Sequence, residues 1–196
     1  MPRTGLTSLE LKENALDQAE ILIRRHGFEK THLVDIAKAL NVSHPVLYRL
    51  FPDKIALLDA VSERWLSRMD AELEAIAKGK GKPLAKLEKW FLTLHRLKKE
   101  KVGHDPELYR AFSSSAEAKR PVVAAHLKHT RENVLHMVQE AIAEKSFKKG
   151  DPEAIARMLS EITISFHHPR LVLDRLKEKR EEALKAALRV LFKGLA

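Results

Sequence analysis

The chain has 196 residues, no cysteine, and a formal net charge of +9 with an isoelectric point near 9.7. The missing cysteine excludes a disulfide framework and any thiolate metal site, and a hydrophobic content of 44% excludes a disordered chain. No apolar run has the length of a membrane span, and the N-terminus lacks the apolar segment of a signal peptide, so we expect a soluble, cytoplasmic protein.

Helices are the only regular structure that the sequence predicts, so the expected fold class is all-α. Between breaks rich in Gly and Pro, apolar residues recur at every third or fourth position. Gly27 is expected to end the first helix and Asn41 the second. Ser43 is expected to cap the third helix, with Pro45 in its first turn, and Asp53 to cap the fourth. About nine helices are predicted, at residues 8–25, 33–40, 43–51, 53–77, 83–100, 105–116, 119–146, 151–167 and 171–194.

The most informative segment covers residues 35–51, with the sequence DIAKALNVSHPVLYRLF. It predicts two short helices joined by a tight turn. Ala37 is small where the two helices would cross, and Val42 and Leu47 are apolar where the pair would share a core. This is the pattern of a helix-turn-helix, whose second helix lies in the major groove of DNA.

The outward-facing side chains of the second helix suit contact with DNA. His44 and Arg49 can donate hydrogen bonds to base edges or phosphates, and Tyr48 offers a hydroxyl. Pro45 and Val46 offer apolar contact to a thymine methyl. From the helix pair alone, a purely structural role is an equal alternative, and Tyr48 could also be a packed core aromatic.

About residues 9–62 resemble the DNA-binding segment of TetR-family regulators, and residues 27–61 carry the pattern. Their sequence, GFEKTHLVDIAKALNVSHPVLYRLFPDKIALLDAV, agrees at more than a dozen positions with the family pattern G-F-x-x-T-[TS]-x-x-x-I-A-x-x-x-G-V-S-x-[GP]-x-L-Y-x-[YH]-F-x-[SN]-K-x-x-L. The resemblance implies phosphate contacts by Tyr48 and Lys54 and a contact of Thr31 with the DNA backbone. It implies base-facing positions at His44, Pro45 and Val46.

Three positions depart from the family pattern. Asn41 replaces Gly, His32 replaces a Thr or Ser, and Leu50 replaces an aromatic residue or His, which removes a phosphate contact there. The expected DNA-binding residues are Thr31, His32, Ser43, His44, Pro45, Val46, Tyr48, Arg49 and Lys54.

The resemblance also implies the architecture and the partners. Residues 1–54 would form the DNA-binding domain, residues 53–77 a connecting helix, and residues 55–196 a helical regulatory and dimerisation domain. Such a protein is a homodimeric repressor without catalytic activity or cofactor, and a small-molecule effector releases it from a double-stranded DNA operator. The alternative is an effector-independent architectural or partner-binding protein on the same scaffold.

Candidate effector-binding residues are the aromatic and polar members of the apolar helix faces. For each of them an ordinary core position is the competing interpretation, because a helical pocket is mostly apolar. The candidates are Trp90, Leu94, Tyr109, Phe112, His136, Met137 and Phe166.

The histidines and the lysines receive less specific interpretations. We expect no metal site, because no HExxH motif is present, and we expect His126 and His129 to form a surface pair. Residues 78–101 contain nine Lys or Arg against two Glu, a run that is interpreted as a solvated face, with attraction of flanking DNA or of an anionic ligand as the alternative.

The last two predicted helices carry apolar stripes that suggest self-association. Part of each stripe is expected to remain free of the protomer's own core, so that two copies form a four-helix bundle about a two-fold axis. The expected interface residues are Ile155, Met158, Leu159, Ile162, Leu184, Ala187, Leu188 and Leu191.

Overall fold

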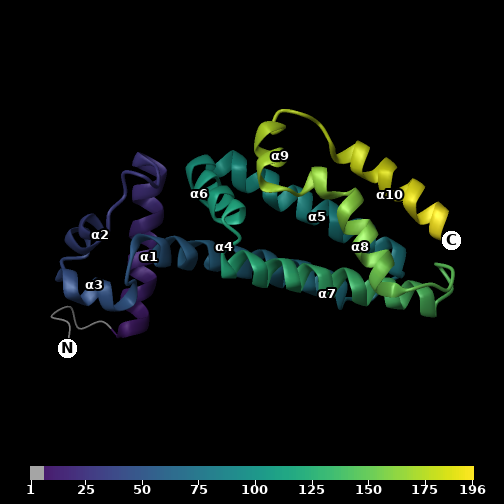
Figure 1. The fold of residues 1–196 in the computed structure, drawn as a ribbon, viewed down its shortest axis with the longest axis horizontal. Coiled ribbons are helices and arrows are strands. Elements are labelled where there is room, and N and C mark those ends of the chain that lie inside the picture. Colours follow the sequence, from purple (N-terminus) through teal and green to yellow (C-terminus); the bar gives the residue numbers. More distant parts are fainter. Residues whose placement is uncertain (1–6) are drawn as a thin grey trace. The chain divides into compact units, whose positions relative to one another are not determined.

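The structure, a computed structural model, describes residues 7–196, and every regular element in that range is a helix. The all-α prediction is therefore confirmed. None of these helices combines the length and the apolar character needed to cross a bilayer. Figure 1 shows the helices α1 (Ser8–His26), α2 (Leu33–Ala39), α3 (His44–Leu50), α4 (Lys54–Ala77), α5 (Pro83–His104), α6 (Pro106–Glu117), α7 (Pro121–Ala143), α8 (Pro152–Ile162), the 3-10 turn η1 (Ile164–Phe166), α9 (Pro169–Asp174) and α10 (Glu181–Leu195).

Local capping signals explain why the first helices begin and end where predicted. Thr7 and Glu10 form a capping box at the start of α1, and Gly27 ends that helix with a φ of 76°. The backbone N–H of Ala56 donates to an Asp53 carboxylate oxygen at 2.7 Å, which caps α4. These contacts satisfy backbone groups that a helix end leaves without partners.

The predicted helix at residues 171–194 is wrong, because α9 and α10 are separated by a non-helical segment at residues 175–180. Leu176 is the one apolar residue in this segment, and contacts with other elements hold it outside a helix. The Arg180 guanidinium donates to the Ser165 carbonyl at 2.6 Å and lies 4.3 Å from the Phe166 ring centroid. Lys99 donates to the Glu178 carbonyl, which in a continuous helix would accept from a backbone N–H. The predicted helix at 151–167 also ends early, at Ile162.

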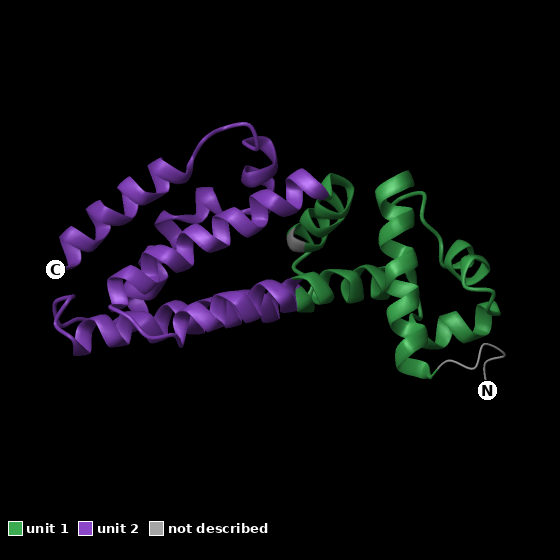
Figure 2. Cartoon of the chain, turned by 180° about the vertical axis from the view of Figure 1, so that it is seen from behind, with its two compact units in different colours: residues 1–65, 105–122 green, residues 66–104, 123–196 purple. Residues whose placement is uncertain are grey.

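The chain forms two compact units, coloured separately in Figure 2. Unit 1 contains residues 1–65 and 105–122, and unit 2 contains residues 66–104 and 123–196. These units divide the chain at other places than the predicted boundary after residue 54: the first half of α4 and all of α6 belong to unit 1. α4 is a single helix with residues in both units.

Unit 1 is built around the inner face of α1. Ala15, Ala19 and Ile23 are fully buried there against residues of α2, α3 and the start of α4. Arg64 of α4 also binds α1, through an ion pair with Asp17 at 2.8 Å and a second ion pair with Glu20. α1 thus connects the helix-turn-helix to α4.

Lys86 in unit 2 contradicts the prediction that the basic run is a solvated face. Its side chain is buried, and its ammonium donates to the carbonyls of Ala77 at 2.8 Å and Gly79 at 3.2 Å. It lies 2.5 Å from a Glu140 carboxylate oxygen. Lys86 therefore caps the C-terminal end of α4, where carbonyls lack partners and a cation is favourable.

Replacing Lys86 with Met should destabilise the protein by about 1–3 kcal/mol, because two buried carbonyls and Glu140 would lose their donor. The free energy of unfolding in urea measures this loss. Lys82→Met is the matched control, since Lys82 is exposed and should change stability by less than about 0.5 kcal/mol. Equal stability of the two variants would contradict the capping role.

Candidate nucleic-acid interface and ligand site

α2 and α3 form the predicted helix-turn-helix in unit 1. The turn passes through Asn41, whose φ of 53° is tolerated by asparagine, and the Val42 N–H donates to the Ala37 carbonyl at 3.0 Å. Ala37 and Leu47 are both fully buried between the helices. One face of α3 is thereby fixed on the core of unit 1, and its other face is left at the surface.

The outer face of α3 carries most of the predicted DNA-binding side chains. Leu47 is the one fully buried residue of α3. Tyr48 is 45% exposed, which argues against its interpretation as a core aromatic. Ser43 precedes the helix as predicted, but its hydroxyl makes no capping hydrogen bond. The exposed residues on this face are Ser43, His44, Pro45, Tyr48 and Arg49, with Val46 partly exposed.

A shallow groove of about 460 Å³ brings together three of the predicted DNA-binding residues, His32, Tyr48 and Lys54. Lys54 already donates one hydrogen bond to the Glu29 carbonyl at 2.8 Å, and its ammonium lies 4.4 Å from the Phe28 ring centroid. An ammonium has three N–H donors, so Lys54 can hold this position and still donate to a phosphate.

Two other positions serve the interior of unit 1. Thr31 is buried, and its hydroxyl donates to the Gly27 carbonyl at 2.9 Å, so the side chain stabilises the loop between α1 and α2. Leu50 packs partly buried against the core, in agreement with the loss of a phosphate contact there.

The predicted effector-binding residues are divided between the units. Tyr109 and Phe112 are buried in unit 1, where both rings contact Trp65 edge-on. His136 is exposed and lies 3.6 Å from Glu140 on the same helix. In unit 2 the buried members are Trp90, Leu94, Met137 and Phe166.

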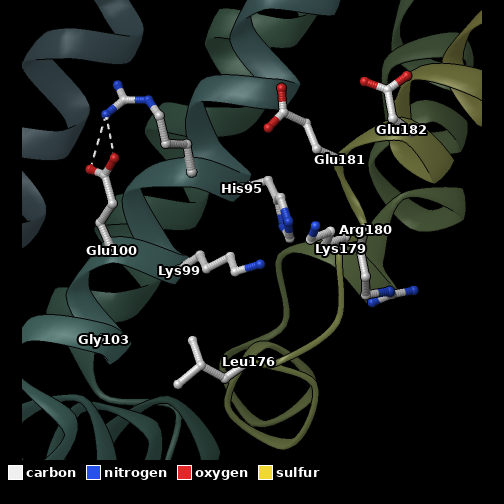
Figure 3. A pocket seen from close by; sticks show the side chains of 10 residues that line it. His95, Lys99, Glu100, Gly103, Leu176, Lys179, Arg180, Glu181 and Glu182 are labelled. Carbon is white, nitrogen blue, oxygen red and sulfur yellow. Dashed lines mark hydrogen bonds and ion pairs between the residues drawn. The ribbon is translucent and has the colours of Figure 1, made fainter.

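Unit 2 has a cleft of about 610 Å³ beside α5, lined by none of the predicted effector-binding residues (Figure 3). Its walls are strongly charged, with residues from α5, the 175–180 segment and the start of α10. The lining residues are His95, Arg96, Lys99, Glu100, Gly103, Leu176, Lys179, Arg180, Glu181 and Glu182.

A buried polar cluster lies in unit 2 and was not predicted. The surface assignment of His126 was wrong: it is 3% exposed, and its Nδ1 donates to the Asp70 carboxylate at 2.6 Å. Lys98 is 5% exposed and donates to the His167 carbonyl at 2.8 Å. His95 Nδ1 donates to the Phe166 carbonyl at 2.9 Å. We call Asp70, His95, Lys98, His126 and His167 the polar cluster.

Helical periodicity contains the signal that could have revealed this cluster. Lys98 lies four residues after buried Leu94 and four before buried Val102, on the apolar stripe of α5. His126 stands three residues after buried Val123 on α7. The residue types of Lys and His favoured a surface assignment, although their positions indicated burial.

Burial changes the protonation of the cluster. It lowers the pKa of the Lys98 ammonium to about 8, and the Asp70 carboxylate opposes part of that change. Burial also lowers the pKa of His167 far below its ordinary value, with further lowering by the positive charges of Lys98, His95 and Arg180. The pKa of His126 is lowered by burial, against the effect of its hydrogen bond to Asp70.

Two family descriptions match the chain. Residues 15–61 match "Bacterial regulatory proteins, tetR family", and residues 83–188, more than half of the chain, match "Tetracyclin repressor-like, C-terminal domain".

Two curated repressors are similar in sequence. The chain is 39% identical over 64 residues to the HTH-type transcriptional repressor ComR of Escherichia coli (strain K12). The aligned residues make up 33% of this chain and 30% of ComR. The chain is 24% identical over 156 residues to the HTH-type transcriptional repressor KstR of Mycolicibacterium smegmatis. These residues make up 80% of this chain and 74% of KstR.

A solved structure shows the same fold. SmeT, the repressor of the Stenotrophomonas maltophilia multidrug efflux pump SmeDEF, superposes with a TM-score of 0.69 at 21% identity, over 98% of this chain and 91% of SmeT. A complex of SmeT with triclosan superposes with a TM-score of 0.66.

The buried histidines predict acid sensitivity. Their pKa values are lower in the folded than in the unfolded chain, so the unfolded state binds more protons below about pH 6.5, and stability falls as the pH falls. Each group contributes at most about 1.4 kcal/mol per pH unit. Urea unfolding between pH 7.5 and 5.5 should show a smaller loss for His167→Gln than for the wild type. His168→Gln, at an exposed neighbouring position, should lose as much as the wild type. Identical losses in both variants would refute the role of His167.

Proposed function

The chain belongs to the TetR family of bacterial regulatory proteins, and we propose that it is a transcriptional repressor that a small-molecule effector releases from its DNA operator. It is a regulator and not an enzyme, as are the proteins that it resembles. The observation that carries the proposal is α3, held on the core by Leu47 with its polar side chains exposed. The protein would act in the cytoplasm, where its operator is.

α3 would lie in the major groove and divide its contacts between bases and backbone. His44, Pro45 and Val46 at the start of α3 would read base edges, with Arg49 one turn later. The sequence-independent contacts would come from the groove next to α3 and from the helix start. The residues proposed to contact phosphates are His32, Ser43, Tyr48 and Lys54, while Thr31 would hold the loop that supports them.

An effector site in unit 2 follows from the buried polar groups there. SmeT is a repressor of the same fold whose structure with triclosan has been solved. In this chain α4 carries Asp70 of the polar cluster and, on its first half, Arg64, which pairs with α1. An effector that binds more tightly when α4 is in one of two positions would shift the protein toward that position, and the DNA-binding helices would shift with it. An effector-independent architectural protein would leave the polar cluster without a role.

The repressor is proposed to be a homodimer formed through α8 and α10. Leu159, Leu184 and Leu188 are buried within the protomer, so these members of the predicted interface serve its own core. Ile162 is 50% exposed and Val190 is 72% exposed. The partly exposed members of the stripes are Ile155, Met158, Ala187 and Leu191. A two-fold dimer of this kind would bind a roughly palindromic operator with half-sites about 34–36 Å apart.

Substitutions in and beside α3 should separate the two kinds of DNA contact. Lys54→Met should weaken binding to all sequences and lower the slope of log affinity against log salt by about 1. His44→Ala should instead change sequence preference, by about 1–3 kcal/mol at the affected base pair. Lys149→Met, an exposed cation of unit 2, is the control and should leave both properties unchanged. Fluorescence anisotropy on DNA from the protein's own upstream region measures both effects. A Lys54→Met protein with an unaltered salt slope would argue against the phosphate contact.

An exposed apolar residue of α8 allows the dimer to be tested without disturbing the protomer. Ile162→Glu should convert the dimer to a monomer, because it would bury a charge in the dimer interface. The fold of the protomer should remain intact, since Ile162 is half exposed there. Leu9→Glu, at an exposed position of α1, should remain dimeric. Light scattering at micromolar concentration gives the mass of each. A wild type with the 22.3 kDa mass of one chain would refute both the dimer and the palindromic operator.

A further inference from the structure

Unit 2 buries hydrogen-bonding groups that have no partner in the part of the chain that the structure describes. They include Trp90 Nε1, Asn133 Nδ2, His126 Nε2 and both ring nitrogens of His167. Buried polar groups in folded proteins are almost always hydrogen-bonded, so each such group requires an explanation. Several such groups in one unit are the hydrogen-bonding groups that a ligand site requires.

The chemical character of that molecule follows from which atoms lack partners. Trp90 Nε1 and Asn133 Nδ2 can only donate, and Lys98 donates one of its three N–H groups, to the His167 carbonyl. The neutral rings of His126 and His167 bring further nitrogens, of which at least one, on His167, is a donor. Donors therefore outnumber acceptors, and a ligand group rich in acceptors fits them.

The charges around Lys98 favour the same kind of group. Lys98 is influenced by Asp70 of α4, and it in turn acts on His126 of α7 and His167, which follows η1. Arg180 adds positive charge near His167. One carboxylate, already bound to His126, is the only negative charge of the polar cluster. With Lys98 protonated and both buried histidines neutral, the charges of Lys98 and Asp70 cancel, and Arg180 makes the surroundings of His167 positive.

The helical positions of these groups indicate an elongated molecule. Trp90, Leu94 and Lys98 lie at intervals of four on α5, which spans about 12 Å along the helix. His126 and Asn133 lie two turns apart on α7, about 10 Å. Buried Leu94 and Met137 supply apolar surface along these stripes. A charged end group on an apolar body matches this order.

We propose that the effector is an amphipathic carboxylate whose anionic group is bound by Lys98, next to the donors of the polar cluster, with its apolar body along α5 and α7. This assignment rests on the proposed repressor function and specifies its effector. The cleft in Figure 3 provides the entrance, because His95 and Arg180 line it and also belong to the surroundings of His167. Lys99 and Lys179 of the same cleft attract an anion.

Binding of this anion affects α4 directly. The carboxylate of the ligand would compete with Asp70 for the positive charge of Lys98. Asp70 lies on α4, so a change in its contacts acts on the helix that also carries Arg64. The coupling free energy would be the difference between the free energies of operator binding with and without the bound ligand.

The experiment compares full-length wild type, Lys98→Met and Lys89→Met against a matched panel. The probes are the straight-chain carboxylates from butanoate to dodecanoate and their phenyl-substituted analogues, each with its primary amide and its amine. Lys89 is exposed on the same helix, so its variant controls for loss of a lysine from α5. Melting temperature and operator affinity are measured for every probe.

At least one carboxylate should raise the melting temperature of the wild type and of Lys89→Met and weaken their operator binding. The matching amide and amine should do neither, and Lys98→Met should bind that carboxylate at least about tenfold more weakly. Between pH 8 and 10 the affinity of the wild type should fall about tenfold per pH unit as Lys98 loses its proton, and the affinity of Lys98→Met should stay constant.

Three outcomes would overturn the assignment: equal binding of a carboxylate and its amide, equal binding by wild type and Lys98→Met, or no response to any carboxylate. In each case retention of operator binding would leave the proposed repressor function intact. A carboxylate that binds through Lys98 in a protein without operator affinity would support the ligand assignment and refute the repressor function.

Discussion

The anchoring of α4 in both units is the constraint on which the rest of the structure depends. Its 24 residues form one uninterrupted helix, and a helix of that length transmits displacement because its backbone hydrogen bonds resist bending. In unit 1 the guanidinium of Arg64 binds α1 through Asp17 and Glu20, and in unit 2 Lys86 caps the terminal carbonyls. Each unit therefore holds its own part of α4 through ion pairs or hydrogen bonds of a cationic side chain.

Much of the fold could be predicted because its boundaries depend on local chemistry. Gly27, Asn41 and Asp53 act through their own backbone conformation or a capping bond a few residues away, so neighbouring sequence is sufficient. The break at residues 175–180 could not be predicted for the opposite reason. It is stabilised by Arg180 on Ser165 and by Lys99 on Glu178, contacts between residues that are far apart in the chain or belong to different elements.

The candidate sites divide in the same way. The face of α3 was predictable, since a short helix with one buried leucine must expose its other side chains. The predicted effector-binding residues are aromatic, apolar or polar members of helix faces, and a core residue has the same pattern as a pocket residue. The prediction therefore grouped Tyr109 and Phe112 with Trp90. Tyr109 and Phe112 pack on Trp65 in unit 1, whereas Trp90 lies in unit 2. Unpartnered polar atoms such as those of His167 distinguish a binding site from a core, and they are visible only in three dimensions.

The energetics of Lys98 give an independent reason to regard the polar cluster as functional. Desolvating an ammonium disfavours its charged form, which is why the pKa of Lys98 is as low as about 8, and a methionine would fill similar space without that cost. Burial keeps His126 and His167 neutral, and His126 Nε2 and both ring nitrogens of His167 lack a hydrogen-bond partner among the described residues. A protein interior optimised for stability alone would contain none of these groups at such positions. Sites that bind or react commonly have this character, because the groups that destabilise the empty protein are the groups that a ligand satisfies.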